Sequence, residues 1–454
     1  MTDVFHILES RGYVYQCTNL EKLAGMLKSG DKITFYLGID PTADSLHIGH
    51  FFALMMFRHL QDAGHRGILV VGGATALIGD PSGKSVMRQM LSKEQVQYNQ
   101  NEVIDLAKRF IITDGDNPAI ILNNADWINQ YTYVDFMRLI GVHFNINTML
   151  SADAYANRLA EGGLTFLEMG YMLMQAFDFV YLHEHYGCVL QIGGSDQWGN
   201  IVAGTALNRK MRRLLRINDN EDNEIAENAE YEKGVNIVES VVEKVIDKTE
   251  SEYADAVNNA CDAEILGLTC PLLLTKEGKK MGKTESGTLW VAREKTTAYD
   301  FYQYFYNVDD LDMQMLLKLF THMPLDEIKV MCDSDIIRAK RVMAFEITKL
   351  VHGEEEADIV LAAVQSLFQG ETSGKNAPES DYIVKEDEIN VVDLFVNAGF
   401  AGSKSEARRL IRQNGAMVDG IRCASPDDII KKPNGRNHVL LKKGKKNFLK
   451  VRFE

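Results

Sequence analysis

The sequence predicts an α/β protein in which a doubly wound, parallel sheet comes first, followed by an α-helical region and a small α+β domain. Short uninterrupted apolar runs are typical of strands buried on both faces of a parallel sheet. Segments of helical period separate the runs, which indicates strands joined by crossover helices. Glycine or polar residues follow each run, as expected where strands end beside a ligand. The runs are residues 33–39, 67–73, 119–123, 188–192 and 267–274.

The first strand and helix enclose a pair of histidines. Residues 33–39 are β-branched and aromatic and lead into a proline turn. Beyond the turn, apolar residues recur at helical spacing from Ile48 until Gly64 ends the run. His47 and His50 share a face of the first helical turn, where unpaired backbone N–H groups and the helix dipole favour an anion. A lone histidine is more often structural, but this pair predicts a phosphate-binding site.

The segment 79–85 is close to a phosphate-binding P-loop but lacks one of its glycines. That motif needs four residues between its glycines, and Ile78 stands where the first would be. The sequence therefore argues against a P-loop kinase or GTPase. Asp80, Lys84 and Arg88 remain candidates for ligand contacts, with a solvated loop as the alternative for the two basic residues.

A later helical segment presents three polar side chains together. Tyr171, Gln175 and Asp178 stand at i, i+4 and i+7, so they project from one face. Such a stripe is usually the solvent side of an amphipathic helix. A phenol, an amide and a carboxylate on one face can also hold an amino acid.

Two more glycine-rich segments follow strands. Residues 191–200 combine a strand, paired glycines and a helix start, which places Asp196 where a ribose could bind, although a purely structural turn is the alternative. Residues 276–284 form a loop rich in lysine and glycine, and such loops are often simply solvated. Two ammonium groups on this loop could also close over phosphates.

Charge is unevenly distributed over the 454 residues. The formal net charge of −15 argues at first against a nucleic-acid partner. An acidic insert at 217–266, however, has fifteen acidic residues against three lysines. Residues 404–454 have fourteen basic residues against five acidic ones. The average therefore conceals a basic C-terminal region that suits RNA.

The cysteines and the N-terminus indicate a cytoplasmic protein. The six cysteines are scattered, with no spacing typical of a metal site, so reduced thiols and no tightly bound metal are expected. The N-terminus lacks the pattern of a signal peptide. No run approaches the ~20 apolar residues needed to cross a bilayer, so no membrane association is expected.

Two signature motifs and a C-terminal segment resemble those of a known family. His-Ile-Gly-His at 47–50 resembles the first signature of class I aminoacyl-tRNA synthetases, and Lys-Met-Gly-Lys-Thr at 280–284 resembles the second, with Gly and Thr in place of two serines. The stretch 36–50 looks most like the bacterial-type tyrosyl enzymes. A capping box at 403–406 precedes an arginine-bearing helix, and residues 388–454 resemble the S-four-like RNA-binding domain.

The resemblance covers nearly the whole chain except the insert, and it implies the domain order. We expect a Rossmann-like catalytic domain at 1–324 with the insert at 217–266, an α-helical anticodon-side domain at 325–369, a linker at 370–387 and the S-four-like domain at 388–454. The implied substrates are L-tyrosine, ATP with Mg²⁺ and tRNA(Tyr). The implied assembly is a homodimer, with the segment 129–146 as its candidate interface.

The resemblance also implies individual roles. Tyr36 and Asp178 would hydrogen-bond the phenol hydroxyl of tyrosine, which phenylalanine would leave unpaired, so no editing domain is expected. The other expected contacts are Asp80, Tyr171 and Gln175 at the ammonium group; Gln191 and Gln197 along the tyrosine pocket; Gly38, Asp40, Thr42, His47, Gly49, His50, Gly194, Asp196 and Lys283 at ATP; His47, His50, Lys280, Lys283 and Thr284 in catalysis; and Arg408, Arg409, Arg412, Lys442 and Lys443 at RNA.

Alternatives remain at this stage. An RNA-binding protein with an inactive catalytic fold would share the motifs. The tryptophanyl relatives share both signatures but lack the pair Tyr36 and Asp178. For the insert, we expect a surface helix with a valine stripe at 235–257 and no catalytic role. The sharper hypothesis is that its negative charge deflects tRNA phosphates.

Overall fold

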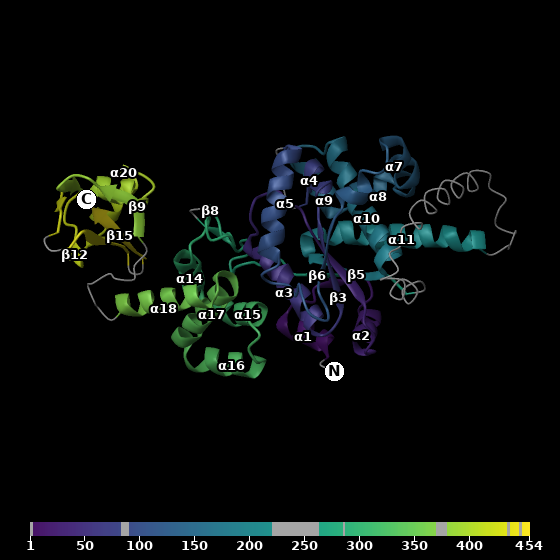
Figure 1. Ribbon diagram of the computed structural model, residues 1–454, viewed down its shortest axis with the longest axis horizontal. Helices are drawn as coiled ribbons and strands as arrows, with labels where there is room; N and C mark the ends of the chain where they lie inside the picture. Colours follow the sequence, from purple (N-terminus) through teal and green to yellow (C-terminus); the bar gives the residue numbers. More distant parts are fainter. Residues whose placement is uncertain are drawn as a thin grey trace. The chain divides into compact units, whose positions relative to one another are not determined.

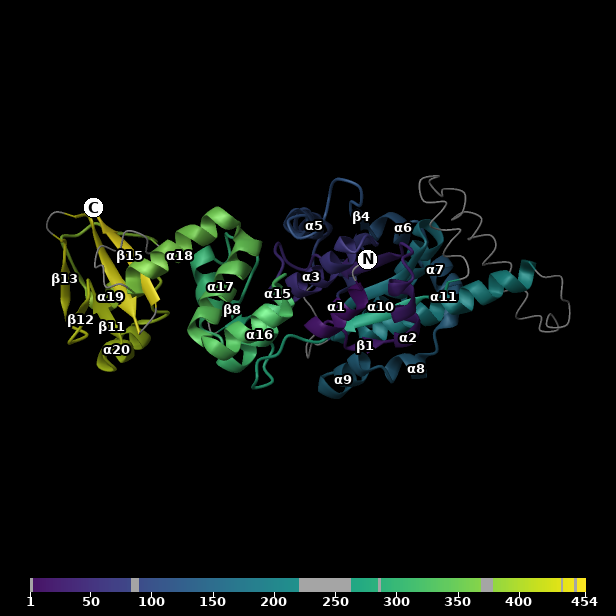
Figure 2. The same ribbon diagram turned by 90° about the horizontal axis from the view of Figure 1, so that it is seen from below.

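The computed structural model describes residues 3–82, 90–219, 263–284, 287–368, 379–433, 436–444 and 447–454 (Figures 1 and 2). The expected insert helix at 235–257 lies outside the described residues, as do Lys84 and Arg88. The chain divides into two compact units. The first comprises Met1–Thr296 and Val308–Ala339, and the second comprises Thr297–Asn307 and Lys340–Glu454. No described helix is both long and apolar enough to span a bilayer.

A six-stranded sheet forms the centre of the first unit, and the predicted doubly wound α/β fold is confirmed. The strand order is β1-β6-β5-β2-β3-β4, with every pair parallel except β1 and β6. The chain runs outward from β2 to β4 and then returns to the other side of β2, so the switch point lies between β2 and β5. The strands are β1 (Gln16–Cys17), β2 (Thr34–Ile39), β3 (Arg66–Val71), β4 (Ile120–Asn123), β5 (Cys188–Gly194) and β6 (Leu266–Cys270).

Two differences from the predicted strands have simple causes. The run at 267–274 ends as a strand at Cys270, because Pro271 cannot donate to a ladder. The edge strand β1 is only two residues long, too short for any periodic pattern.

Helices cover both faces of the sheet (Figure 1). Phe35 points toward α3 and packs against Phe57 with ring centroids 4.8 Å apart, whereas Tyr36 points to the opposite face and packs against Phe179 of α10 at 5.2 Å. This alternation places the two motif-bearing helices on opposite sides of β2. The helices of this unit are α1 (Val4–Arg11), α2 (Leu20–Lys28), α3 (Ile48–Asp62), α4 (Thr75–Ile78), α5 (Lys93–Ala107), α6 (Ala125–Ile128), α7 (Tyr133–Leu139), α8 (Ile146–Leu150), α9 (Asp153–Glu161), α10 (Phe166–Tyr186), α11 (Trp198–Asp219), α15 (Met313–Phe320) and α16 (Leu325–Ser334), with short 3-10 turns η1 (Gly141–His143), η2 (Ser195–Gln197) and η4 (Asp310–Asp312).

The second unit contains three helices and a small α+β domain. The helices are α14 (Ala298–Tyr306), most of α17 (Ile336–His352) and α18 (Glu354–Phe368). The α+β domain has a sheet in the order β12-β11-β14-β15-β9, a two-stranded sheet of β10 and β13, and two helices. Its elements are β9 (Glu379–Val384), β10 (Glu388–Asn390), α19 (Val391–Asn397), α20 (Lys404–Arg412), β11 (Ala416–Val418), β12 (Ile421–Arg422), β13 (Ile429–Lys431), β14 (His438–Lys443) and β15 (Asn447–Phe453).

The compact units and the expected domain boundaries divide the chain differently. α16 groups with the first unit, although the helical domain is expected to begin at residue 325, and α14 groups with the second. The segment 370–387, expected as a linker, contains strand β9, which pairs in parallel with β15. The first half of β9, residues 379–381, consists of two acidic residues and a serine, and this polar composition resembles that of a linker.

Candidate active site

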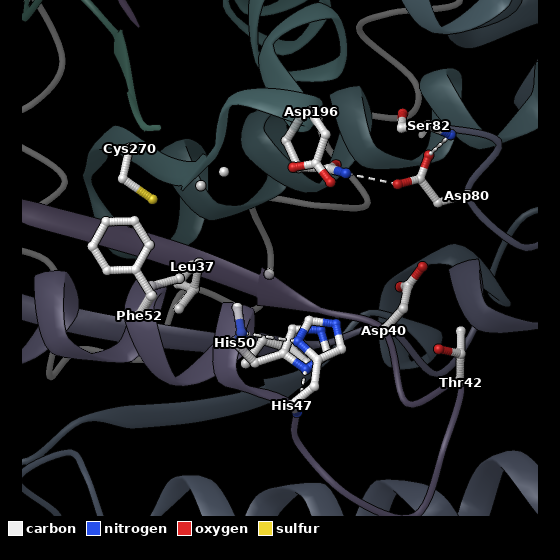
Figure 3. A pocket seen from close by; sticks show the side chains of 18 of the residues that line it. Leu37, Asp40, Thr42, His47, His50, Phe52, Asp80, Ser82, Asp196 and Cys270 are labelled. Carbon is white, nitrogen blue, oxygen red and sulfur yellow. Dashed lines mark hydrogen bonds between the residues drawn. The ribbon is translucent and has the colours of Figure 1, made fainter. Parts of the chain in front are cut away.

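A pocket of about 460 Å³ lies in the first unit at the carboxyl ends of the parallel strands. Its lining includes Gly38, Ile39 and Asp40 at the end of β2 and Gly193, Gly194 and Asp196 at the end of β5, so it opens at the switch point of the sheet. Figure 3 shows His47 and His50 on one side of this pocket, with Asp80 and Asp196 on the opposite side. The fold therefore brings together segments that are up to about 250 residues apart in the chain.

The two histidines cap helix α3 with their own rings. His47 is the N-cap residue, and its Nδ1 accepts hydrogen bonds from the backbone N–H groups of Gly49 and His50 at 3.1 and 3.3 Å. Nδ1 of His50 accepts in return from the N–H of His47 at 3.4 Å. The two rings are stacked, with centroids 3.7 Å apart and 10° between their planes.

This cap fixes which ring nitrogen can act. An Nδ1 atom that accepts a backbone hydrogen bond carries no proton, so Nε2 carries it in both neutral rings. Two Nε2–H groups at the positive end of a helix dipole form a site for an anion such as phosphate. Gly49 suits this packing, because a Cβ atom there would crowd the His47 ring at 3.0 Å.

Tyr36 and Asp178 are buried side chains that both line the pocket. Tyr36 is 1% exposed, and its hydroxyl has no hydrogen-bond partner among the described residues. Burial, and next the charge of Asp178, raise the pKa of Tyr36 well above its usual value. Burial also raises the pKa of Asp178 to about 8. The Tyr36 hydroxyl is therefore a buried polar group without a partner among the described residues, and a phenol of a ligand could supply one.

Asp178 is held by two residues to which the sequence assigned no individual role. Its Oδ1 accepts from Nε1 of Trp127 at 2.8 Å, and its Oδ2 accepts from Nδ2 of Asn124 at 3.1 Å. Asn124 also donates to the Thr75 hydroxyl at 3.0 Å. The position of Asn124 directly after a strand was a signal for the site, whereas nothing around Trp127 or Thr75 distinguishes them from core residues.

Tyr171 and Asp40 bond to each other. The Tyr171 hydroxyl donates to Oδ2 of Asp40 at 2.8 Å, and the Thr75 hydroxyl donates to Oδ1 at 2.7 Å. A Cβ atom on Gly72 would lie 2.0 Å from Oδ1 of Asp40, so the close approach of the strand end depends on that glycine. The network links the residue expected at the substrate ammonium group, Tyr171, to one expected at ATP, Asp40.

Asp80 and Gln197 form a second polar pair. Oδ2 of Asp80 accepts from Nε2 of Gln197 at 2.6 Å, and Oδ1 accepts from the backbone N–H of Ser82 at 2.9 Å. The Oε1 atoms of Gln175 and Gln191 are buried and have no hydrogen-bond partner among the described residues. Such orphaned acceptors at a pocket wall favour a ligand that donates hydrogen bonds there.

Lys280 reaches the side of the pocket that Asp196 lines. Its Nζ lies 4.0 Å from Oδ2 of Asp196, and a Cβ atom on Gly194 would lie 2.6 Å from the same carboxylate. Lys283 and Thr284 form strand β7, which pairs with β8 (Gly287–Thr288), but their side chains are outside the description.

Most of the expected tyrosine, ATP and catalytic residues line this one pocket. Lys283 and Thr284 are the exceptions, for the reason just given. The residues of the lining are Tyr36, Gly38, Asp40, Thr42, His47, Gly49, His50, Asp80, Tyr171, Gln175, Asp178, Gln191, Gly194, Asp196, Gln197 and Lys280. Within the part of the chain that the structure describes, no group of three His, Cys, Asp or Glu side chains could hold a metal ion.

The expected RNA-binding residues lie on two elements of the α+β domain. Arg408, Arg409 and Arg412 are exposed on α20. Lys443 on β14 pairs with Glu406 at 2.7 Å, and Lys442 lies over the Phe448 ring at 4.9 Å. Ser403 caps α20, but Glu406 accepts from the N–H of Gly402 instead of closing the expected capping box.

The sequence matches two family descriptions. Residues 28–369 match tRNA synthetases class I (W and Y), and residues 371–451 match the tyrosine–tRNA ligase SYY-like C-terminal domain. The tyrosine–tRNA ligase of Clostridium kluyveri is 41% identical over 455 residues, with 99% of both chains covered. That of Clostridium botulinum strain Loch Maree is 42% identical over 460 residues, with both chains fully covered.

Solved structures are also similar. The C-terminally truncated mitochondrial tyrosyl-tRNA synthetase of Aspergillus nidulans is 26% identical, with a TM-score of 0.63 over 81% of this chain and 95% of that one. The corresponding protein of Coccidioides posadasii is 26% identical, with a TM-score of 0.59 over 80% and 92%.

Proposed function

This chain belongs to the tyrosine–tRNA ligases of class I, and on that premise we propose how its pocket performs their reaction. The reaction has two steps. The carboxylate of L-tyrosine attacks the α-phosphorus of ATP, giving tyrosyl-adenylate and pyrophosphate. The 3′-terminal ribose hydroxyl of tRNA(Tyr) then takes the tyrosyl group and releases AMP.

The observation that carries the proposal is the pairing of two chemically different ends in one pocket. At one end, the buried Tyr36 hydroxyl lies beside the charge of Asp178 and lacks, among the described residues, a partner that a phenol could supply. At the other end, His47 and His50 direct Nε2–H groups from a helix N-terminus. A molecule with a phenol that must meet a triphosphate fits this arrangement.

For tyrosine, we assign the phenol to Tyr36 and Asp178. The ammonium group would be held by Asp80 and Gln175, with Gln191 and Gln197 along the wall of the pocket. The hydroxyl oxygen of Tyr171, which donates a hydrogen bond to Asp40, would accept one from the ammonium group. Because phenylalanine has no hydroxyl, it would leave the buried Tyr36 hydroxyl unsatisfied, which disfavours its binding by about 1–3 kcal/mol.

For ATP, we assign binding of the phosphates to His47, His50 and the lysine-rich loop at residues 276–284. The Nε2–H groups of His47 and His50 would stabilise charge that develops on the phosphates, and Lys280 and Lys283 would follow the departing pyrophosphate. Asp196 would accept hydrogen bonds from the ribose. Gly38, Thr42, Gly49 and Gly194 would allow close approach, and Thr284 would complete the loop. Mg²⁺ would enter with the ATP phosphates, which are its usual ligands.

For tRNA, we assign binding to the α+β domain and to the helices of the second unit. Arg408, Arg409 and Arg412 present three guanidinium groups on one exposed helix, and arginine suits phosphate contacts. Lys442 and Lys443 lie on the adjacent sheet, although Lys443 is partly neutralised by Glu406.

We also propose a homodimer and a cytoplasmic location. The segment 133–146 leaves four large apolar side chains between 59% and 67% exposed, namely Tyr133, Val134, Val142 and Ile146. Such a concentration on a surface is typical of a protein interface. The cysteines described by the structure are free thiols, which is typical of the reducing cytoplasm.

Pyrophosphate exchange into ATP tests the function. The assay is run with tyrosine, tryptophan and phenylalanine in turn, and exchange should depend on tyrosine alone. Loss of tyrosine selectivity in Tyr36→Phe, with exchange retained, would support the assignment of the phenol. Exchange driven by tryptophan, or by none of the three, would contradict the proposed function.

A further inference from the structure

The lysine-rich loop at residues 276–284, the lysine loop, contacts the first turn of helix α3 at Gly282. Gly282 has φ +79°, and a Cβ atom built on it would lie 2.4 Å from Cγ2 of Ile48. Ile48 is the first residue of α3 and stands between His47 and His50 in the sequence. The backbone of one signature segment therefore rests directly on a side chain of the other.

Residues 289–291, which follow the loop, make backbone contacts with Gly282 and with the turn that precedes α3. The N–H of Leu289 donates to the carbonyl of Gly282 at 2.7 Å. Next along the chain, Trp290 forms a β-bridge with His47, and the N–H of Val291 donates to the carbonyl of Leu46 at 2.8 Å. These contacts hold both ends of the segment 282–291 against the turn that begins α3.

The two residues before Gly282 are also held by contacts with neighbouring segments. Met281 is buried, and its N–H donates to the carbonyl of Leu273 at 2.8 Å. Lys280 forms a β-bridge with Leu274, and its Nζ lies 4.0 Å from the Asp196 carboxylate. The place of Gly282 on Ile48 thus sets how far Lys280 stands from the groups that line the pocket.

We propose that Gly282 is a positioning residue, whose lack of a side chain seats the lysine loop on Ile48 at the distance that adenylate formation needs. The inference deepens the proposed function and rests on it. An ordinary contact begins at 3.4 Å, so a methyl group at position 282 would require a movement of about 1 Å. A misplacement of that size costs on the order of 10²-fold in rate when charged groups must meet a transition state.

A competing explanation is that position 282 needs glycine only for its backbone angle. Gly278 separates the two explanations, because it lies in the same loop with φ +75° and has no atom within 4 Å of a Cβ built on it. Gly278→Ala therefore introduces the same backbone strain as Gly282→Ala without the overlap with Ile48.

The first measurement compares these two variants in tyrosine-dependent pyrophosphate exchange. We expect kcat of Gly282→Ala to fall at least about tenfold further than kcat of Gly278→Ala. KM for tyrosine should stay unchanged in both variants, because Tyr36 and Asp178 belong to β2 and α10 and not to the loop. Equal losses in the two variants would overturn the proposal and leave the backbone angle as the whole explanation.

The second measurement removes the overlap from the other side. In an Ile48→Ala background the nearest Ile48 atom to position 282 is Cβ at 3.6 Å, an ordinary contact. Ile48→Ala alone is expected to lower activity, but Gly282→Ala should then cost much less than it costs in the unaltered chain. The same cost in both backgrounds would contradict a seat on Ile48.

A third measurement does not depend on activity. Trypsin should cleave after Lys279 or Lys280 faster in folded Gly282→Ala than in folded Gly278→Ala, with equal thermal unfolding temperatures as the control. An unaltered chain that shows no exchange would contradict the proposed function, whereas equal cleavage of the two variants would contradict the seat alone.

Discussion

His47 and His50 cap the same helix reciprocally, because the backbone N–H of each residue donates to Nδ1 of the other's ring. The rings are stacked 3.7 Å apart as a result. One pair of side chains therefore stabilises the helix start and also supplies the two Nε2–H groups. These two roles can be separated by substitution.

His47→Asn should keep the helix cap and lose the reaction. Asparagine is a good N-cap residue, whereas alanine gives up about 1 kcal/mol of stability at such a position. Both variants lose Nε2–H, so both should lose about 10²-fold or more in kcat for pyrophosphate exchange. Only His47→Ala should show a lower unfolding temperature. Retained exchange in His47→Asn would show that His47 acts only as a cap.

Asp178→Asn should change the pH dependence of stability. Because the pKa of Asp178 is raised by burial to about 8 from an ordinary 3.8, the folded chain holds a proton between these values that the unfolded chain has lost. The contribution of Asp178 to the free energy of unfolding therefore falls as the pH rises from about 4 to about 8.

The variant lacks this proton, so its stability relative to the unaltered chain should rise with pH by up to about 1.4 kcal/mol per unit. Urea unfolding at several pH values across this window measures the difference. Asp105→Asn is the control, because the Asp105 side chain is 76% exposed. A difference between Asp178→Asn and the unaltered chain that does not vary with pH would contradict the raised pKa.

Gly72→Ala should disrupt the hydrogen bonds of Asp40. The added methyl group would lie 2.0 Å from Oδ1 of Asp40 and 2.3 Å from the Thr75 hydroxyl. We expect a loss of about 1–3 kcal/mol in the free energy of unfolding, together with a higher KM for ATP. Gly25→Ala, in α2 and with open space around it, should instead gain about 0.5–1 kcal/mol. Equal thermal shifts in the two variants would contradict the overlap.

Replacing Arg408, Arg409 and Arg412 together by alanine should weaken tRNA binding and leave pyrophosphate exchange unchanged. If each arginine contacts one phosphate, the slope of log K against log salt should decrease by about 2–3. The charge-matched control replaces Lys28, Arg58 and Lys108, which form ion pairs in the first unit. A similar loss of tRNA affinity in the control would mean that net charge alone is responsible.

Val134→Asp with Val142→Asp should convert a dimer into monomers. The two valine side chains are 59% and 67% exposed, and buried charges at an interface are strongly unfavourable. Sedimentation velocity measures the mass of each species. Leu311→Asp is the control, because Leu311 is 76% exposed elsewhere in the first unit. An unaltered chain that sediments as a monomer would contradict the homodimer.

The sequence was sufficient for the parts of the site that depend on local order. Strand β2, helix α3 and the two histidines at the start of α3 are consecutive, so periodicity and turn chemistry predict their places but not the reciprocal cap. The parallel sheet follows from apolar runs, and its topology then requires the strand ends to converge. Strand β9 was missed because its polar composition resembles a linker.

The hydrogen-bond partners inside the pocket could not be predicted in the same way. Trp127 bonds to Asp178 across 51 residues of chain, and Thr75 bonds to Asp40 across 35. Such partners depend on side-chain geometry in the folded core, which no periodic pattern records. The contact between Gly282 and Ile48 is of the same kind, because the sequence around a loop glycine does not indicate which atoms a side chain there would overlap.

Helix α10 also fixes the distance between Tyr171 and Asp178. Tyr171 and Asp178 are seven residues apart on one rigid helix, which separates their backbones by about 10 Å. The two ends of the proposed amino-acid site are thus spaced by a helix that cannot stretch. The length of the bound amino acid is therefore selected together with its functional groups. An analogue with one methylene group too many or too few could satisfy either end of the site but not both.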